Sequence, residues 1–160
     1  MFGRTSADTQ IGTLKRGWGK WHGHISVPGF EAMEVLIEIK RNEPLDPFVQ
    51  AASVFSASFP EIKEQFAKDL YDLYSTYKKL DIQTGYCTDA DFAEYPHVDS
   101  AANIWTALKP DYLRLGPPIH KYLGNSYLIT NVAWPNPHYF QLFMQYCDDS
   151  FRAMHVEVVG

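Results

Sequence analysis

The clearest pattern in the chain spans residues 58–80, where apolar side chains recur every three or four positions. This spacing places them on one face of an amphipathic helix. Ser58, Pro60 and Glu61 supply a capping oxygen, a proline in the first turn and a carboxylate three residues after the serine, so we expect the helix to begin there. The residues of the apolar stripe are Ile62, Phe66, Leu70, Leu73, Tyr77 and Leu80.

A shorter helix is predicted directly before this one. Asp46 can act as its N-cap and Pro47 can occupy its first position, and the helix should end near Ser56. Its apolar side consists of Phe48, Ala51, Ala52 and Phe55. Because the two helices follow each other without a long loop, we expect an αα-hairpin.

Alternating apolar and polar residues predict strands on both sides of the helices. Residues 20–27 and 34–40 alternate and are joined by the turn signal Pro28-Gly29, which indicates an antiparallel hairpin. Residues 1–13 show no periodicity and should be loose or form a short edge segment. The strands predicted after the helices span residues 112–115, 126–134, 139–147 and 151–159.

Two short helical segments are predicted between the long helix and the last strands, at residues 88–94 and 99–108. The chain therefore consists of a run of strands, a run of helices and a second run of strands. Segregated runs predict an α+β fold in which an antiparallel sheet, made of the N-terminal hairpin and the C-terminal strands, packs against the αα-hairpin. A length of 160 residues favours a single domain over residues 1–160.

Composition narrows the function classes. The net charge of −5 argues against binding to a nucleic-acid backbone, which needs a basic face. The aromatic share of 15% indicates a core or a binding face rich in rings. The two cysteines are too few for a disulfide framework. No secretory signal or membrane span is visible, so we expect a cytoplasmic protein with no membrane partner.

Candidate chemistry is sparse. His22 and His24 would project from one face of a strand, as a zinc site needs, but two histidines on a solvent face have the same spacing. A third ligand would have to come from His97, Asp99, His120, His138 or His155. No serine lies in a G-x-S-x-G elbow, and the glycines do not form a phosphate loop. We expect no cofactor and no catalytic residue.

An acidic cluster and two tyrosines are the best candidates for binding a partner. The acids either dock a basic partner surface or serve as a solvated region at the helix starts. The tyrosines lie outside the main apolar stripe, so they either pack under a neighbouring element or form an exposed aromatic anchor. The candidate partner-binding residues are Asp89, Asp91, Glu94, Asp99, Tyr71 and Tyr74.

Five short segments occur in a recognisable order. They are a tryptophan and glycine hairpin, a strand, a helix with glutamine and small residues before an aromatic, a tyrosine-bearing helix end, and a tryptophan with a histidine four residues later. The segments are residues 18–23, 35–38, 50–55 and 71–77, and Trp134 with His138. Together they resemble a group of small bacterial domains of unknown function often found among toxin immunity proteins. The turn at 135–139 departs from that group, where it is usually acidic and ends in His-Gly.

The resemblance implies a non-enzymatic protein that binds a cognate bacterial toxin and neutralises it by occlusion. We expect Trp134 and His138 to be structural, with the imidazole bonded to loop carbonyls. Two alternatives stay open on the residues alone. One is a small metal-dependent hydrolase that uses the His22/His24 face, and the other is a homodimeric accessory module.

Overall fold

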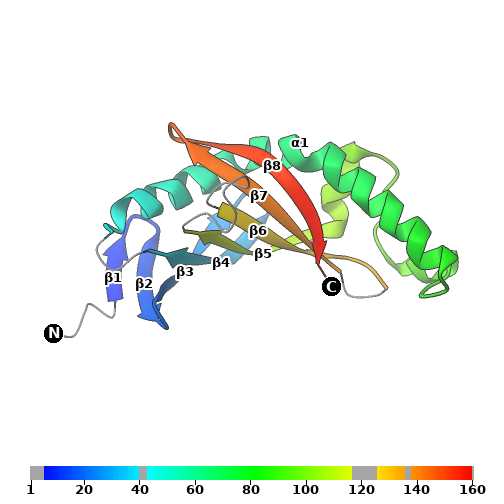
Figure 1. Ribbon diagram of the computed structural model, residues 1–160, viewed down its shortest axis with the longest axis horizontal. Coiled ribbons are helices and arrows are strands. Elements are labelled where there is room, and N and C mark those ends of the chain that lie inside the picture. The colour runs from blue at the N-terminus through cyan, green and yellow to red at the C-terminus, as the bar shows by residue number, and fades with distance from the viewer. Residues whose placement is uncertain (1–5, 40–42, 117–125, 136–137, 160) are drawn as a thin grey trace.

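Eight strands form one sheet whose order in space is their order in the sequence, and one long helix lies against it (Figure 1). The computed structural model describes residues 6–39, 43–116, 126–135 and 138–159. The strands are β1 (Ser6–Thr9), β2 (Gly12–Gly17), β3 (Lys20–Val27), β4 (Phe30–Glu38), β5 (Leu108–Leu115), β6 (Ser126–Val132), β7 (Tyr139–Cys147) and β8 (Ser150–Val159). The helices are α1 (Asp46–Gln83) and the 3-10 helices η1 (Asp89–Glu94) and η2 (Ala101–Ala107).

The sheet is mixed. The neighbours β4 and β5 run parallel, and every other neighbouring pair is antiparallel. A parallel pair needs a crossover connection, and α1 supplies it. The α+β class is therefore confirmed, whereas the prediction of an antiparallel sheet is not, because β4 and β5 run parallel. The C-terminal strands join the N-terminal hairpin in the same sheet.

The parallel pair is the seam between two antiparallel halves, β1–β4 and β5–β8. An ion-pair cluster lies across this seam, because the Glu38 carboxylate at the end of β4 pairs with both Arg114 of β5 and Lys20 of β3. The Lys20 Nζ to Glu38 Oε1 distance is 2.7 Å. A Cβ atom added to Gly116 would lie 3.0 Å from the Glu38 carbonyl oxygen, so glycine allows the chain to pass close to β4 here.

The predicted αα-hairpin is wrong, because α1 continues without a break through residues 56–60. The Ser58 hydroxyl does not cap a new helix; it donates to the Val54 carbonyl one turn back, at 2.5 Å. Pro60 lies inside the helix and removes one intrahelical hydrogen bond. Phe55 and Phe59 are fully buried in the turns just before this proline, and their packing favours the continuous helix.

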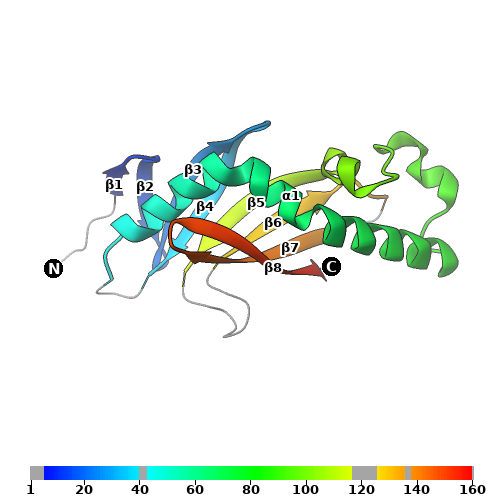
Figure 2. The ribbon, with the colours of Figure 1, turned by 90° about the horizontal axis from the view of Figure 1, so that it is seen from above.

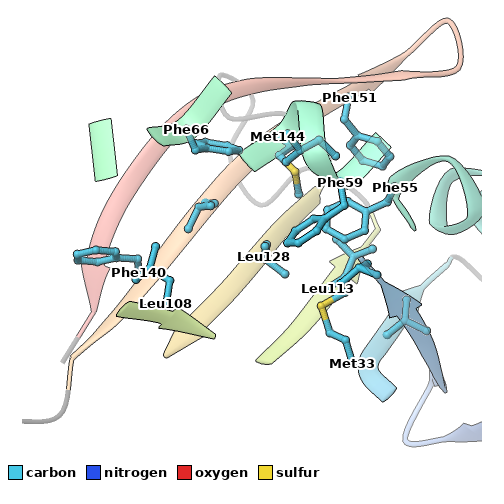
Figure 3. Close-up of a cluster of buried hydrophobic side chains, with 14 of the residues drawn as sticks. Met33, Phe55, Phe59, Phe66, Leu108, Leu113, Leu128, Phe140, Met144 and Phe151 are labelled. Atoms are coloured by element: carbon cyan, nitrogen blue, oxygen red, sulfur yellow. The ribbon is translucent and has the colours of Figure 1, made fainter. Parts of the chain in front are cut away.

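The sheet curves around α1. Neighbouring residues of the helix contact strands that are far apart in the sheet: Ser56 donates to the Ser26 carbonyl of β3, and Phe55 meets Phe151 of β8 edge-on. The Phe55 and Phe151 ring centroids lie 5.6 Å apart. Figures 1 and 2 show the helix lying diagonally across one face of the sheet, and Figure 3 shows the aromatic and aliphatic side chains packed between them.

The first two strands form a hairpin at one end of the sheet. β1 lies within residues 1–13, for which a short edge segment is one of the two expectations, and residues 1–5 lie outside the described chain. Leu14 of β2 is fully buried and lies over Gly23 of β3. A Cβ atom at position 23 would overlap Leu14 Cδ2, so a glycine is needed for this contact. Three other predicted features also lie outside the described residues: the strand end at Lys40, the candidate ligand His120, and the centre of the turn at 136–137.

Candidate partner-binding surface

All four predicted acidic residues are exposed on the segment that follows α1. We call residues 88–99 the acidic segment. Asp91 accepts a hydrogen bond from the Thr88 backbone N–H at 2.7 Å, which closes a capping box at the start of η1. Asp99 accepts from the Asn103 side-chain amide at 2.8 Å. Two of the four acids thus serve helix starts, as one of the two interpretations predicted, while their carboxylates remain at the surface.

Phe92 anchors the acidic segment from below. Its side chain is buried, and its ring meets the Trp134 ring edge-on with centroids 5.1 Å apart. The Lys78 ammonium of α1 lies 4.5 Å from the Phe92 ring centroid, a cation–π distance. The segment therefore presents its carboxylates from a fixed backbone, which lowers the conformational entropy that a partner must remove on binding.

The two tyrosines of α1 differ in role. Tyr71 is half-buried, and its hydroxyl donates to the Asp99 carbonyl at 2.9 Å, so it fixes the end of the acidic segment. Tyr74 is 2% exposed and lies edge-on to Trp134 with centroids 4.8 Å apart. Burial raises the pKa of the Tyr74 hydroxyl. Of the two alternatives for Tyr74, packing under a neighbouring element is confirmed, because the Trp134 side chain covers the helix face on which it lies, and its place among the candidate partner-binding residues is wrong.

A buried carboxylate lies beneath this surface. Asp81, in the last turn of α1, is 6% exposed. Its Oδ2 accepts a hydrogen bond from Trp134 Nε1 at 2.7 Å and lies 3.0 Å from His138 Nε2. The Asp81 carbonyl accepts the Tyr86 backbone N–H at 3.0 Å. Asp81 therefore ties together the end of α1, the turn that follows it and the connection between β6 and β7.

The imidazole of His138 differs from its expected arrangement. We expected it to bond loop carbonyls, but it faces the Asp81 carboxylate and stacks edge-on against Trp134, with centroids 5.2 Å apart. His138 Nδ1 is buried and has no hydrogen-bond partner among the described residues. A buried carboxylate is stable only when donors such as these surround it. The arrangement therefore has a structural role beneath the acidic segment.

The two histidines considered as metal ligands lie on the helix-free face of the sheet. His22 Nδ1 is 3.6 Å from Glu34 Oε1, and His24 is exposed. Over residues 6–39, 43–116, 126–135 and 138–159, no group of three histidine, cysteine or acidic side chains is placed to hold a metal ion. His97 and Asp99, named as third ligands, lie on the acidic segment instead, where their side chains are 3.8 Å apart.

Sequence reasoning missed two aromatic features. Trp18, at the turn between β2 and β3, is fully exposed and has a φ of 53°, which is rare for a bulky residue. On the helix-free face, ring contacts continue across four strands, from β5 to β8. These contacts form a row of rings that consists of Tyr112, Tyr127, Phe143 and His155. The position of Trp18 between Gly17 and Gly19 was a usable turn signal, whereas the row of rings depends on strand register, which no local pattern gives.

Comparison of the chain with protein-family models, with curated proteins and with solved structures found no match. Of the helices in the described part of the chain, none combines the length and the apolar character that crossing a bilayer requires.

Proposed function

We propose that this chain is an immunity-type protein that binds a cognate bacterial toxin in the cytoplasm and neutralises it by covering its functional site. The observation that carries the proposal is the acidic segment, which holds four exposed carboxylates on a backbone fixed by two capping boxes and by Tyr71. The resemblance of the chain to the immunity group supports the same class.

The acidic segment would attract a basic surface. Asp89 and Glu94 are exposed and form no ion pair with another described residue, so their charge is available to a partner. Clustered charge of one sign accelerates association with a surface of opposite sign and orients the encounter. A stable complex needs roughly 800 Å² buried on each partner, so neighbouring surface must also take part. No bond is made or broken in this mechanism.

The experiment takes the domain encoded next to this chain in the source genome as the candidate toxin domain. The first measurement asks whether co-expression of this chain restores growth to cells that produce the toxin domain. The second compares association rates of the wild-type chain and the Asp89→Lys/Glu94→Lys variant with the purified toxin domain. We expect the variant to associate at least tenfold more slowly at low salt and to lose much of that difference at high salt.

The matched control is the Glu31→Lys/Asp111→Lys variant, which changes the net charge equally at exposed positions on β4 and β5. We expect this control to associate at nearly the wild-type rate. Equal slowing of both variants would mean that net charge alone acts and that the acidic segment is not the docking surface. A failure to restore growth would remove the immunity function.

A further inference from the structure

The strand β8 has a free outer edge. Among the described strands it pairs with β7 alone, and it lies at the end of the sheet that they form (Figure 1). Gln65 of α1 covers one part of this edge: its Oε1 accepts the Ala153 backbone N–H at 2.9 Å, and its Nε2 donates to the Phe151 carbonyl at 3.5 Å. From Met154 to Val159, no described residue pairs with the outer edge. An unpaired strand edge can accept another extended chain.

A groove of about 300 Å³ lies between this free edge and α1. Its walls include Asp69, Asp72 and Thr76 of the helix, and Met154 and Val156 of the strand. Met154 is 41% exposed and lies at an irregularity in the β7–β8 register, where His155 pairs with Phe143 and Ala153 pairs with Met144. The groove therefore joins a hydrogen-bonding strand edge, an exposed apolar side chain and a helix wall.

The helix wall of the groove is acidic. Asp69 is exposed and makes no ion pair within the described chain, and Asp72 pairs with Lys68 at 2.7 Å. Both members of that pair are largely exposed, so the pair is weak and a cation from outside can replace it. The charge of the wall thus selects a basic occupant, and the strand edge selects an extended backbone.

We propose that an extended, basic segment of a partner protein binds in this groove as an additional strand. Its backbone would pair with β8 between Met154 and Val159, and its lysine or arginine side chains would contact Asp69 and Asp72. This inference deepens the proposed function by adding a second contact with the same partner. The acidic segment contacts α1 through Tyr71 and Lys78. Residues that line the groove lie on the opposite flank of the helix.

The first test uses a capped nine-residue peptide that alternates lysine with threonine, and the full chain. Amide hydrogen exchange is followed by NMR with and without the peptide. Strand addition predicts at least tenfold slower exchange for outer-edge amides between residues 154 and 159, and no change in β2. The same peptide with proline at its centre should give no protection, because proline cannot complete the strand pairing. Protection that is absent, or equal with the proline peptide, would overturn the inference.

The second test measures the affinity of the same peptide for charge variants. Asp69→Lys/Asp72→Lys should weaken binding at least tenfold. The control is Glu64→Lys, at an exposed position of α1 that does not line the groove, and it should bind almost as the wild-type chain does. Equal weakening by both variants would mean that binding is nonspecific.

The two proposals fail in different ways. If only the acidic segment binds the toxin domain, the Asp69→Lys/Asp72→Lys variant will associate normally while Asp89→Lys/Glu94→Lys does not, and the groove inference is overturned alone. A second copy of this chain, paired through β8, is the other occupant that the experiments distinguish. A solution mass that doubles with concentration, together with protection of the same amides without peptide, would identify that dimer and overturn the basic segment as the occupant.

Discussion

At the scale of single residues, Asp81 illustrates how one buried charge fixes the chain around it. Its carboxylate has two side-chain partners, Trp134 and His138, which flank the turn between β6 and β7. A carboxylate removed from water is costly unless donors surround it, and donors left without it are costly in turn. The conformation of the acidic segment therefore depends on the buried Asp81 carboxylate.

We predict that Asp81→Ala lowers the free energy of unfolding by about 3 kcal/mol, because it leaves the Trp134 N–H and the His138 ring without their acceptor. Urea unfolding followed by tryptophan fluorescence measures the change. Asp69→Ala, at an exposed position of the same helix, is the control and should change stability by less than about 0.5 kcal/mol. A loss below about 1 kcal/mol for Asp81→Ala would contradict the structural role.

Trp18 leads to a second prediction at this scale. A left-handed backbone conformation costs a bulky residue about 1–2 kcal/mol, and asparagine tolerates it better. Trp18→Asn should therefore raise stability by about 1 kcal/mol in thermal unfolding, since the exposed indole contributes little packing. Trp18→Ala is the control and should give no comparable gain. A loss of stability in Trp18→Asn would show that the indole makes contacts that stabilise the fold.

At the scale of elements, local patterns predicted most strands well. Alternation gave the bounds of β3 and β7 as the structure has them. It missed β1 and β2, which are short and carry a single fully buried residue, Leu14. The parallel pairing of β4 with β5 could not be predicted, because it depends on contacts between residues far apart in the sequence rather than on local periodicity.

The start signal at residues 58–61 was misread for the same reason. The capping and proline pattern was present, but the burial of Phe55 and Phe59 decided that the helix continues through it. The candidate site shows the same limit. The exposed acids followed from composition and position, whereas the separate roles of Tyr71 and Tyr74, and the pairing of Asp81 with His138, depend on tertiary contacts that no local pattern contains.

The proline inside α1 gives a prediction for the element. A proline in a helix interior costs about 3 kcal/mol relative to alanine when the helix is free. The helix is bent where it lies along the curved sheet (Figure 2), and proline favours such a bend. We therefore expect Pro60→Ala to stabilise the protein by less than about 1 kcal/mol in urea unfolding. A gain near 3 kcal/mol would show that the bend does not contribute to packing.

At the scale of the whole molecule, the seam between β4 and β5 holds the two halves of the sheet together. Burial alone would raise the pKa of Glu38, but hydrogen bonds from Arg114 and Lys20 outweigh it, so the pKa lies below the ordinary value of 4.5. A lowered folded-state pKa stabilises the protein above the unfolded value, and this contribution is lost as the pH falls through the folded value.

We therefore predict that the seam weakens in acid. The stabilisation that Glu38 contributes should be constant with pH near neutrality, should begin to fall as the pH drops below about 4.5, and should be lost as the pH falls through the lower folded-state pKa. Thermal unfolding between pH 3 and pH 7 measures this. Glu38→Gln should be less stable than the wild type at pH 7 and should lose less on acidification. Identical pH profiles for the two proteins would contradict the assignment.

The order of the strands also bears on how the chain is made. Each strand lies next to the strand synthesised immediately before it, so pairing can follow emergence from the ribosome without waiting for distant sequence. Only β5 has to cross back over a finished helix to meet its neighbour. Until β5 and the strands after it are in place, the apolar stripe of α1 lacks its contacts with β7 and β8, and that interval is when a chaperone has the most to shield.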